Sequence, residues 1–274
     1  MNRFLLLLKT SRPIFWLVAP LVFIGGLIVG ETKFSVLSVI QLVLLSFPYS
    51  LFVFGINDIY DYASDKINSR KKLVEGTVLQ PKYHNFVKRM AWFSGFILLL
   101  SALFTFNILN IILMILLLVI SYYYSAKPLR FKEIPIMDSI TNGLGFLLVA
   151  LLGFSFGSSI EQLPIKALFV AGCVSAMHAL TTIVDYQVDK KAKIKTFSTV
   201  LGKRSAALFA LIIFIITIIF SNILSIAILC YLVICVLSSL IILIYPNETF
   251  SLVVNRILFV LFLITIVSYL IFRF

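Results

Sequence analysis

Three carboxylates and one amide are concentrated in residues 57–65, directly after an apolar run. Only 11 of the 274 residues are acidic, so three within eight positions is a strong concentration. On a helix of 3.6 residues per turn, Asn57, Asp61 and Asp65 recur every four residues. Asp58 lies beside them, within an arc of roughly 100°. Such a row of oxygen ligands suits a hard cation and the anion that the cation carries.

A second, shorter acidic motif consists of Asp185 and Asp189, again four apart at the end of an apolar run. Magnesium binds through one or two carboxylates plus substrate phosphates, so the two motifs could hold two such ions. The alternative is a solvated acidic helix end, but these carboxylates lie among many bases, which favours a metal site. The predicted Mg²⁺ ligands are Asn57, Asp58, Asp61, Asp65, Asp185 and Asp189.

Basic residues accompany both acidic motifs. Arg12 precedes Pro13 at the start of the first apolar span, and the loop 124–132 places three cations among apolar residues. Metal-binding carboxylates ringed by bases are typical of a diphosphate pocket. The alternative, that the bases only determine topology, is kept for Lys82, Lys88, Arg89, Lys203 and Arg204. The predicted diphosphate-binding residues are Arg12, Arg70, Lys127, Arg130, Lys132, Lys193 and Lys195.

The composition is that of a polytopic membrane protein. The chain is 61% hydrophobic, with a mean hydropathy of +1.11. The net charge of +12 comes from loops between apolar segments, which the positive-inside rule explains better than nucleic-acid binding. Cys173, Cys230 and Cys235 lie in apolar runs and are expected to be packing residues. The run Leu5 to Leu8 is too short for a cleavable signal peptide, so none is expected.

The sequence predicts an all-α bundle of nine transmembrane helices that forms one domain over residues 1–274. Tight turns are expected near residues 107–110 and near Asn222. Pro20 and Pro48 are expected to kink their helices. The predicted spans are 13–30, 36–56, 86–107, 109–125, 137–157, 165–184, 205–221, 223–245 and 253–272.

The distribution of Lys and Arg predicts the orientation of these spans. One side of the bundle carries 20 of these residues and the other side carries 3. The richer side should be cytoplasmic, which predicts a protein of the cytoplasmic membrane with its N-terminus inside and its C-terminus outside. Both acidic motifs would then belong to a cytoplasmic cap.

Two glycine pairs with GxxxG spacing permit close helix contact in the first and fifth spans: Gly26/Gly30 and Gly153/Gly157. The recurrence of an acidic motif four spans later also suggests an internal duplication. In that interpretation, spans one to four and five to eight are related units, and the ninth span is an addition.

The acidic and basic motifs together resemble those of the UbiA superfamily of intramembrane prenyltransferases. Residues 57–65 match its NDxxDxxxD motif, and 185–189 match its DxxxD motif. The early Arg12-Pro13 and the Tyr-Ser-x-x-Pro-Leu-Arg loop that begins at Tyr124 also match. The resemblance covers nearly the whole chain and implies a helical bundle around a central cavity that opens to lipid.

Finer features are similar to the lycopene elongase branch of that superfamily. The similar segments are 11–16, 138–143 and 177–202, with departures at Lys127 and at Ala192-Lys193. The similarity implies a long apolar acceptor, most of all a carotenoid such as lycopene, and a C5 allylic diphosphate as donor.

The resemblance implies Mg²⁺-dependent prenyl transfer from an allylic diphosphate to a hydrophobic acceptor within the bilayer. Mg²⁺ and the basic residues would stabilise the leaving diphosphate, and aromatic rings would stabilise the allylic cation. His178 lies seven residues before Asp185 and could be a base or a packing residue. The residues assigned to the substrate cavity are Tyr62, Tyr124, Asn142, His178 and Thr182.

Three other functions stay open at this point. Within the enzyme class, the runner-up is an aromatic prenyltransferase of quinone biosynthesis. Outside it, an ion-coupled transporter would use intramembrane carboxylates, but these carboxylates lie at helix ends. A non-catalytic scaffold is the third alternative, and the intact motifs argue against it.

Overall fold

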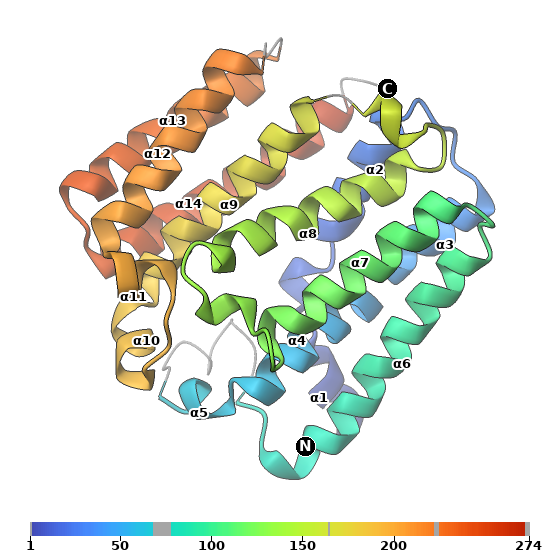
Figure 1. The fold of residues 1–274 in the computed structure, drawn as a ribbon, viewed down its shortest axis with the longest axis horizontal. Coiled ribbons are helices and arrows are strands. Elements are labelled where there is room, and N and C mark those ends of the chain that lie inside the picture. The colour runs from blue at the N-terminus through green and yellow to red at the C-terminus, as the bar shows by residue number, and fades with distance from the viewer. Residues whose placement is uncertain (1, 68–77, 164, 222–224, 272–274) are drawn as a thin grey trace. The chain divides into compact units, whose positions relative to one another are not determined.

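The computed structural model describes residues 2–67, 78–163, 165–221 and 225–271, and every regular element within them is helical (Figure 1). Short 3₁₀ turns occupy Pro13–Phe15, Pro81–Tyr83, Phe131–Glu133 and Ile160–Gln162. The α-helices are α1 Arg3–Thr10, α2 Val18–Val29, α3 Val36–Leu44, α4 Phe47–Tyr60, α5 Tyr62–Asp65, α6 His84–Leu103, α7 Ile108–Ser125, α8 Met137–Phe154, α9 Lys166–Val184, α10 Tyr186–Ala192, α11 Phe197–Leu201, α12 Lys203–Phe220, α13 Ile226–Ile244 and α14 Glu248–Ile271.

Eight of the described segments are long and apolar enough to cross a membrane, and a bent pair makes a possible ninth. The bent pair joins α1 to residues 13–29 at an angle of 48°. The all-helical membrane fold predicted from the sequence is therefore confirmed. Helix α1 was not predicted, because its apolar residues are too few to read as a span.

The chain forms two compact units. The first consists of residues 1–130 and 148–163, and the second of 131–147 and 164–274. The single domain and the internal duplication expected from the sequence stay predictions.

In the first unit, α4, α6 and α7 pack side by side (Figure 1). Phe52, Ile56, Ala91 and Ala126 form a buried cluster between them. Burying each large aliphatic or aromatic side chain of this kind contributes roughly 1.5–3 kcal/mol. This packing fixes the ends of α4 and α7, from which the candidate site is built.

The two glycine pairs pack α2 against the end of α8 within the first unit. A Cβ added to Gly26 would overlap the carbonyl oxygen of Ala150, and one added to Gly153 would overlap that of Phe23. Only glycine allows the two backbones to approach so closely. The expected close contact is confirmed. The structure adds that the two motifs lie in one helix contact, since Gly26 of α2 meets α8 and Gly153 of α8 meets α2.

Both prolines lie in the first turn of a helix. Pro48 follows the break that separates α3 from α4, and Pro20 follows the turn that precedes α2. Proline favours this position, because its missing N–H leaves no helical bond unmade there. The kinks expected at Pro20 and Pro48 stay predictions.

A turn between Leu103 and Ile108 separates α6 from α7, four residues earlier than the predicted end of the third span. Phe106 has a left-handed backbone, with φ 52°, which ends the helical path. The side chain of Asn107 then accepts from the N–H groups of Leu109 and Asn110 at 2.9 and 3.3 Å. The predicted tight turn is confirmed here, while the one near Asn222 lies outside the described residues.

A buried polar pair connects α3 to α7 in the first unit. The side chain of Gln41 donates to that of Asn110 at 2.7 Å, and both residues are closed off from solvent. Asn110 also donates to the hydroxyl of Ser155 at 2.9 Å. Each polar group therefore has a partner, as burial within a helical bundle requires.

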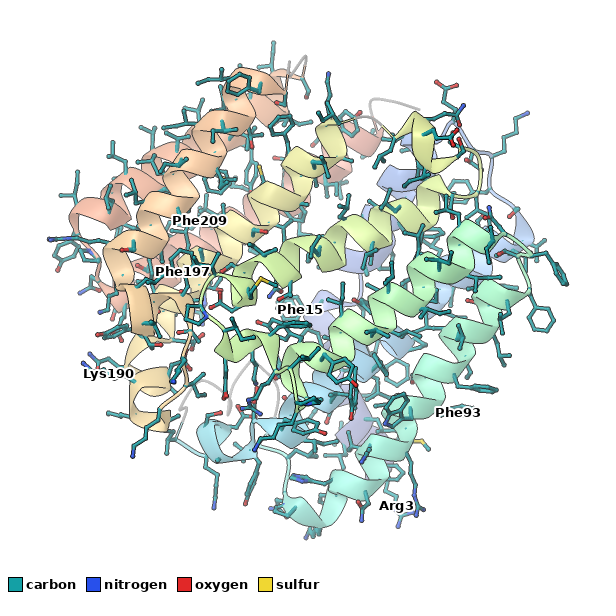
Figure 2. The ribbon with its side chains drawn as sticks, in the orientation of Figure 1. Arg3, Phe15, Phe93, Lys190, Phe197 and Phe209 are labelled. Atoms are coloured by element: carbon teal, nitrogen blue, oxygen red, sulfur yellow. The ribbon has the colours of Figure 1, made fainter. Side chains whose placement is uncertain are left out.

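In the second unit, α9, α12, α13 and α14 enclose the other large core (Figure 1). Small residues of α12, among them Ala206, Ala207 and Ala210, are fully buried and let α9 approach closely. Figure 2 shows Phe197 of α11 beside Phe209 of α12, with ring centroids 5.3 Å apart. This contact holds α11 to the end of the helical core.

Candidate functional site

The first acidic motif lies where α4 ends and the short helix α5 begins. Asn57 and Asp58 belong to the last turn of α4, Asp61 forms the junction, and Asp65 ends α5. The backbone N–H of Asp61 bonds to the carbonyl of Asn57, and that of Asp65 to the carbonyl of Asp61, both at 2.9 Å. The expected spacing of one helical turn is thus kept.

The predicted regular helix through this motif is wrong in one detail. Asp61 has φ −99° and ψ 4°, so the helix is interrupted at that residue. The carbonyl of Tyr60, at the end of α4, accepts from the guanidinium of Arg130 at 3.4 Å. A cation at a helix C-terminus stabilises its last carbonyls, so the arginine supports the interruption.

Arg12 contacts the start of this motif. Its Nη2 donates to Oδ1 of Asp58 at 2.8 Å and lies 3.4 Å from Oδ1 of Asn57. Its guanidinium also stacks over the ring of Phe54, 4.3 Å from the centroid. Asp58 is fully buried, and a buried ion pair of this kind depends on both partners being held in place. The cation–π contact holds the arginine at its partner.

Arg130 contacts the middle of the motif. Its Nη2 donates to Oδ1 of Asp61 at 3.3 Å, and its Nη1 contacts the carbonyl of Ser125 at 3.3 Å. The hydroxyl of Ser125 in turn accepts from the side-chain amide of Asn57 at 3.0 Å. The end of α7 and the loop after it are therefore tied to the first acidic motif.

Three of the predicted diphosphate-binding residues have a left-handed backbone. The φ angles of Arg12, Arg130 and Lys193 are 52°, 43° and 58°. Such conformations are uncommon for residues other than glycine and cost energy, so they persist where the surroundings impose them. Glu31, Phe106 and Ile136 share this conformation, so it marks tight turns of the chain and is not confined to the predicted site.

The second acidic motif repeats the geometry of the first within the second unit. Asp185 forms the junction between α9 and α10, with φ −89° and ψ −2°. The N–H of Asp189 bonds to the carbonyl of Asp185 at 2.9 Å, as at the first motif. Both residues are half-buried. A long apolar helix thus ends at an aspartate in both units, and a short helix carries the next one.

The other predicted basic residues differ in burial. Lys132 is buried, whereas Lys127, Lys193 and Lys195 are exposed. Burial of a lysine is rare unless the charge is compensated, so Lys132 is more closely integrated into the fold than the other three. Arg70 lies outside the described residues.

The five residues assigned to the substrate cavity are divided between the two units. Tyr62 packs edge-on against His84, and Tyr124 is half-buried at the end of α7. Thr182 is buried, and its hydroxyl donates to the carbonyl of Ala179 on its own helix at 2.8 Å.

Asn142 and His178 instead belong to one polar cluster of the second unit. The side chain of Asn142 donates to the carbonyl of Asp138 at 2.9 Å. The imidazole of His178 contacts the hydroxyl of Ser139, which donates to the Asp138 carboxylate. The sequence-based assignment missed Asp138. Its signal was a lone acidic residue at the start of an apolar span, where an ionisable group is functional by default.

The donor set of the first motif suits Mg²⁺. Asp58, Asp61 and Asp65 are buried oxygen donors, and Asn57 adds a neutral oxygen. Across the parts of the chain that are described, no three His, Cys, Asp or Glu side chains form a preorganised metal cage. Mg²⁺ needs no such cage, because it binds through one or two carboxylates and completes its shell with phosphates and water.

Comparison with known proteins finds relatives of this chain among prenyltransferases and carotenoid biosynthesis proteins. The model of the UbiA prenyltransferase family matches residues 17–256. A lycopene elongase/hydratase of Haloarcula japonica is 34% identical over 209 residues, which are 72% of this chain and 67% of that protein. The C(50) beta-cyclic carotenoids biosynthesis protein LbtBC of Dietzia sp. is 31% identical over 204 residues. That match covers 74% of this chain and 47% of the Dietzia protein. This chain therefore spans about half the length of that relative.

A solved structure shares the fold. The structure of a UbiA homologue from Archaeoglobus fulgidus, bound to DMAPP and Mg²⁺, matches with a TM-score of 0.69 at 22% identity. The match covers 95% of this chain and 99% of that one. At this level of identity the comparison shows a common helical fold.

Proposed function

The chain belongs to the UbiA prenyltransferase family, and from this premise we propose that it transfers a C5 allylic group from its diphosphate to a carotenoid. Prenyl transfer is the reaction of the family as a whole. The C5 donor, the carotenoid acceptor and the roles of individual residues are the proposal.

The observation that carries the proposal is the pairing of each arginine with an aspartate of the first motif. Arg12 pairs with Asp58 at 2.8 Å, and Arg130 pairs with Asp61 at 3.3 Å. Positive and negative groups that are both partly shielded from water interact strongly with a charged ligand. Carboxylates bind a metal ion and guanidinium groups bind phosphate oxygens, so the two together suit a metal-bound diphosphate.

We assign the metal to the carboxylates of both motifs. Asp58, Asp61, Asp65, Asp185 and Asp189, with Asn57, would hold Mg²⁺, which when bound would neutralise diphosphate oxygens and make the diphosphate a better leaving group. Asp58 and Asp61 are already buried next to arginines, so the local structure tolerates concentrated charge.

The arginines bind and orient the donor in this proposal. A guanidinium presents planar, paired N–H donors that match phosphate oxygens. Arg12 and Arg130 are held by several contacts each, so their donors need little reorganisation as negative charge develops on the leaving group. Lys132 and the exposed Lys127, Lys193 and Lys195 would contribute further positive charge.

The apolar interior excludes water from the allylic cation, which water would otherwise trap. Aromatic residues near the first motif are suited to stabilise that cation through their ring faces. Phe15 and Phe54 lie with ring centroids 5.4 Å apart, and Trp92 lies 5.2 Å from Tyr122.

The carotenoid acceptor is supported by two relatives and by the hydrogen bonds of polar side chains assigned to the cavity. Both relatives bear names from carotenoid biosynthesis. A polar head group such as a phenol would need several hydrogen-bonding partners on leaving water, whereas a polyene needs only apolar lining. Thr182 bonds to its own helix, and Asn142 donates to a backbone carbonyl, so neither favours a polar head group.

We also propose that the protein lies in the cytoplasmic membrane. The helix ends that carry the two acidic motifs would face the cytoplasm. The excess of Lys and Arg on that side supports this orientation.

The test is a transfer assay with the purified full chain in lipid vesicles. Dimethylallyl diphosphate and Mg²⁺ are supplied with lycopene or with 4-hydroxybenzoate, and products are identified by mass spectrometry. We expect addition of C5 units to lycopene. A parallel assay with geranyl diphosphate tests the donor, and we expect the C5 compound to be preferred. Transfer to the benzoate with none to lycopene would contradict the carotenoid acceptor and leave prenyl transfer standing.

A further inference from the structure

Helix α1, in the first unit, has apolar side chains both inside and outside its contact with the protein. Leu6 is buried against Leu79 and Val87, in a cluster that joins α1 to the start of α6. Away from that contact, Phe4 is 66% exposed and Leu5 is 44% exposed. The inner face of α1 is therefore held by the protein, while its outer face presents large apolar side chains to the surroundings.

Helix α1 also lies where the chain enters the membrane. It meets the apolar segment 13–29 at an angle of 48°, and Arg12, with φ 52°, lies at the corner. Trp16 follows the corner, and its indole N–H donates to the hydroxyl of Ser11 at 3.1 Å. Tryptophan is concentrated at the boundary between lipid headgroups and acyl chains. At that depth an amphipathic helix lies along the membrane surface with its apolar side chains among the lipids.

Three basic side chains accompany the exposed apolar ones. Arg3 begins α1 and Lys9 lies in its last turn, and both are exposed. The guanidinium of Arg3 lies beside α6, 5.3 Å from the centre of the Phe86 ring (Figure 2). Lys82, also exposed, precedes Phe86 by four residues, so the two share one face of the helical segment 81–103. Long basic side chains lay their carbon stems on apolar groups and extend their charge to headgroup phosphates.

Positive charge is in excess around α1. The sequence has no Asp or Glu in residues 1–30 or 76–132, which supply α1 and α6. Helix α4 also packs against α1, but its Asp58 is buried and pairs with Arg12 at 2.8 Å. The exposed bases of α1 and Lys82 are therefore suited to an external anion, and the apolar side chains between them require that this anion also carry an apolar part.

We propose that α1 and the start of α6 form a binding site for acidic phospholipids, made of Arg3, Phe4, Leu5, Lys9 and Lys82. The lipid phosphates contact the three bases, and the acyl chains cover the two apolar side chains. A zwitterionic phospholipid supplies the same acyl chains, but its own cation offsets the phosphate. A phospholipid with a net negative charge satisfies both parts of the site, so it binds more tightly. This site does not depend on which donor or acceptor the enzyme uses.

The experiment measures which lipid contacts α1 in the full chain. Trp16→Phe and Trp92→Phe remove both native tryptophans, and Phe4→Trp introduces one at the proposed site. The chain is reconstituted in vesicles of phosphatidylcholine mixed with brominated phosphatidylglycerol or brominated phosphatidylcholine, because bromine quenches tryptophan fluorescence at close range. Quenching at equal mole fractions gives the relative affinity for the two lipids. We expect a preference of about 10-fold for phosphatidylglycerol. In about 1 M NaCl most of this preference should disappear, since salt screens exposed charges.

Charge substitutions identify the residues that select the lipid. We expect Arg3→Gln/Lys9→Gln to reduce the preference to about 2-fold, because two of the three bases are lost. Arg3→Lys keeps the charge and should keep the preference within about 2-fold of its starting value. Lys33→Gln is the matched control for Lys9→Gln, because it removes one exposed lysine from another loop of the same unit. It should leave the preference unchanged, whereas Lys9→Gln should lower it by about 3-fold.

Equal quenching by the two brominated lipids would overturn the proposal, and so would a preference that survives in Arg3→Gln/Lys9→Gln. An introduced tryptophan that neither lipid quenches would show that a protein or another part of the chain covers α1, which also overturns it. If the tryptophan variant fails to fold, native mass spectrometry compares how much added phosphatidylglycerol the unsubstituted chain and Arg3→Gln/Lys9→Gln retain. Equal retention would contradict the site. Thermal melting of each purified variant verifies that it is folded.

Discussion

The side chain of Arg130 makes contacts that lysine cannot reproduce. Its backbone is left-handed, at a cost of roughly 1–3 kcal/mol, and its guanidinium reaches Asp61 and the carbonyls of Tyr60 and Ser125. We expect Arg130→Ala to lower kcat/KM for the donor by about 100-fold and Arg130→Lys to restore only part of it. Steady-state kinetics measure both. Arg89→Ala, at an exposed position on α6, is the control and should behave like the unsubstituted chain.

The aspartates at the two helix junctions are the sharpest test of the metal assignment. Asp61→Asn and Asp189→Asn keep the side-chain size but remove the negative charge that binds a cation. We expect each to lower Mg²⁺-dependent turnover by about 100-fold or more while melting close to the unsubstituted chain. Glu161→Gln, in an exposed turn, is the charge-matched control. Near-normal turnover in Asp61→Asn would show that the metal ligands lie elsewhere.

Helix α2 contains two adjacent glycines in opposite environments. A Cβ at Gly26 would overlap the backbone of Ala150, whereas a Cβ at Gly25 would meet nothing within 4 Å. We expect Gly26→Ala to reduce the free energy of unfolding by about 1–3 kcal/mol, because α2 and α8 must separate. Gly25→Ala should be neutral or stabilising by up to about 1 kcal/mol, since alanine favours a helix. Thermal unfolding in detergent compares the two, and equal effects would refute the close contact.

The polar pair between α3 and α7 allows a test of helix association. Gln41→Leu leaves the Asn110 side chain without its 2.7 Å donor, and we expect a loss of about 1 kcal/mol in stability. The double variant Gln41→Leu/Asn110→Leu should be more stable than the sum of the two single losses, because two apolar residues replace a matched pair. Strict additivity in detergent unfolding experiments would show that the two residues act independently.

The orientation of the whole molecule stays a prediction that labelling can decide. Lys33 and Lys127 are both exposed and lie in loops that the charge distribution assigns to opposite sides. In a background where the exposed Cys230 is replaced by serine, we expect Lys127→Cys to react with an impermeant maleimide only from the cytoplasmic side. Lys33→Cys should react only from the outside. The reverse pattern would overturn the assignment from positive charge.

The local pattern of apolar and charged residues was sufficient to predict the positions of most transmembrane helices. Spans ending at Ser125, Val184 and Phe220 were placed within about two residues, because apolar length and flanking charge are local properties of the sequence. The helix α1 and the interruption at Asp61 were not foreseen. Helix α1 has too few apolar residues to read as a span. The interruption at Asp61 depends on a residue distant in the sequence, through the bond from Arg130 to the end of α4.

The sequence by itself determined the class of protein, the positions of the two acidic motifs and the family they resemble. Chemistry of this kind is carried by residue types at fixed spacings, and a helical turn converts spacing into proximity. Only the tertiary structure decided which arginine meets which aspartate, which helix each GxxxG motif contacts, and that Asp138 and His178 share one hydrogen-bonded cluster. Those contacts join residues 39 to 69 positions apart at the site. Helix packing brings such residues together, and no periodicity along the chain encodes the choice of partner.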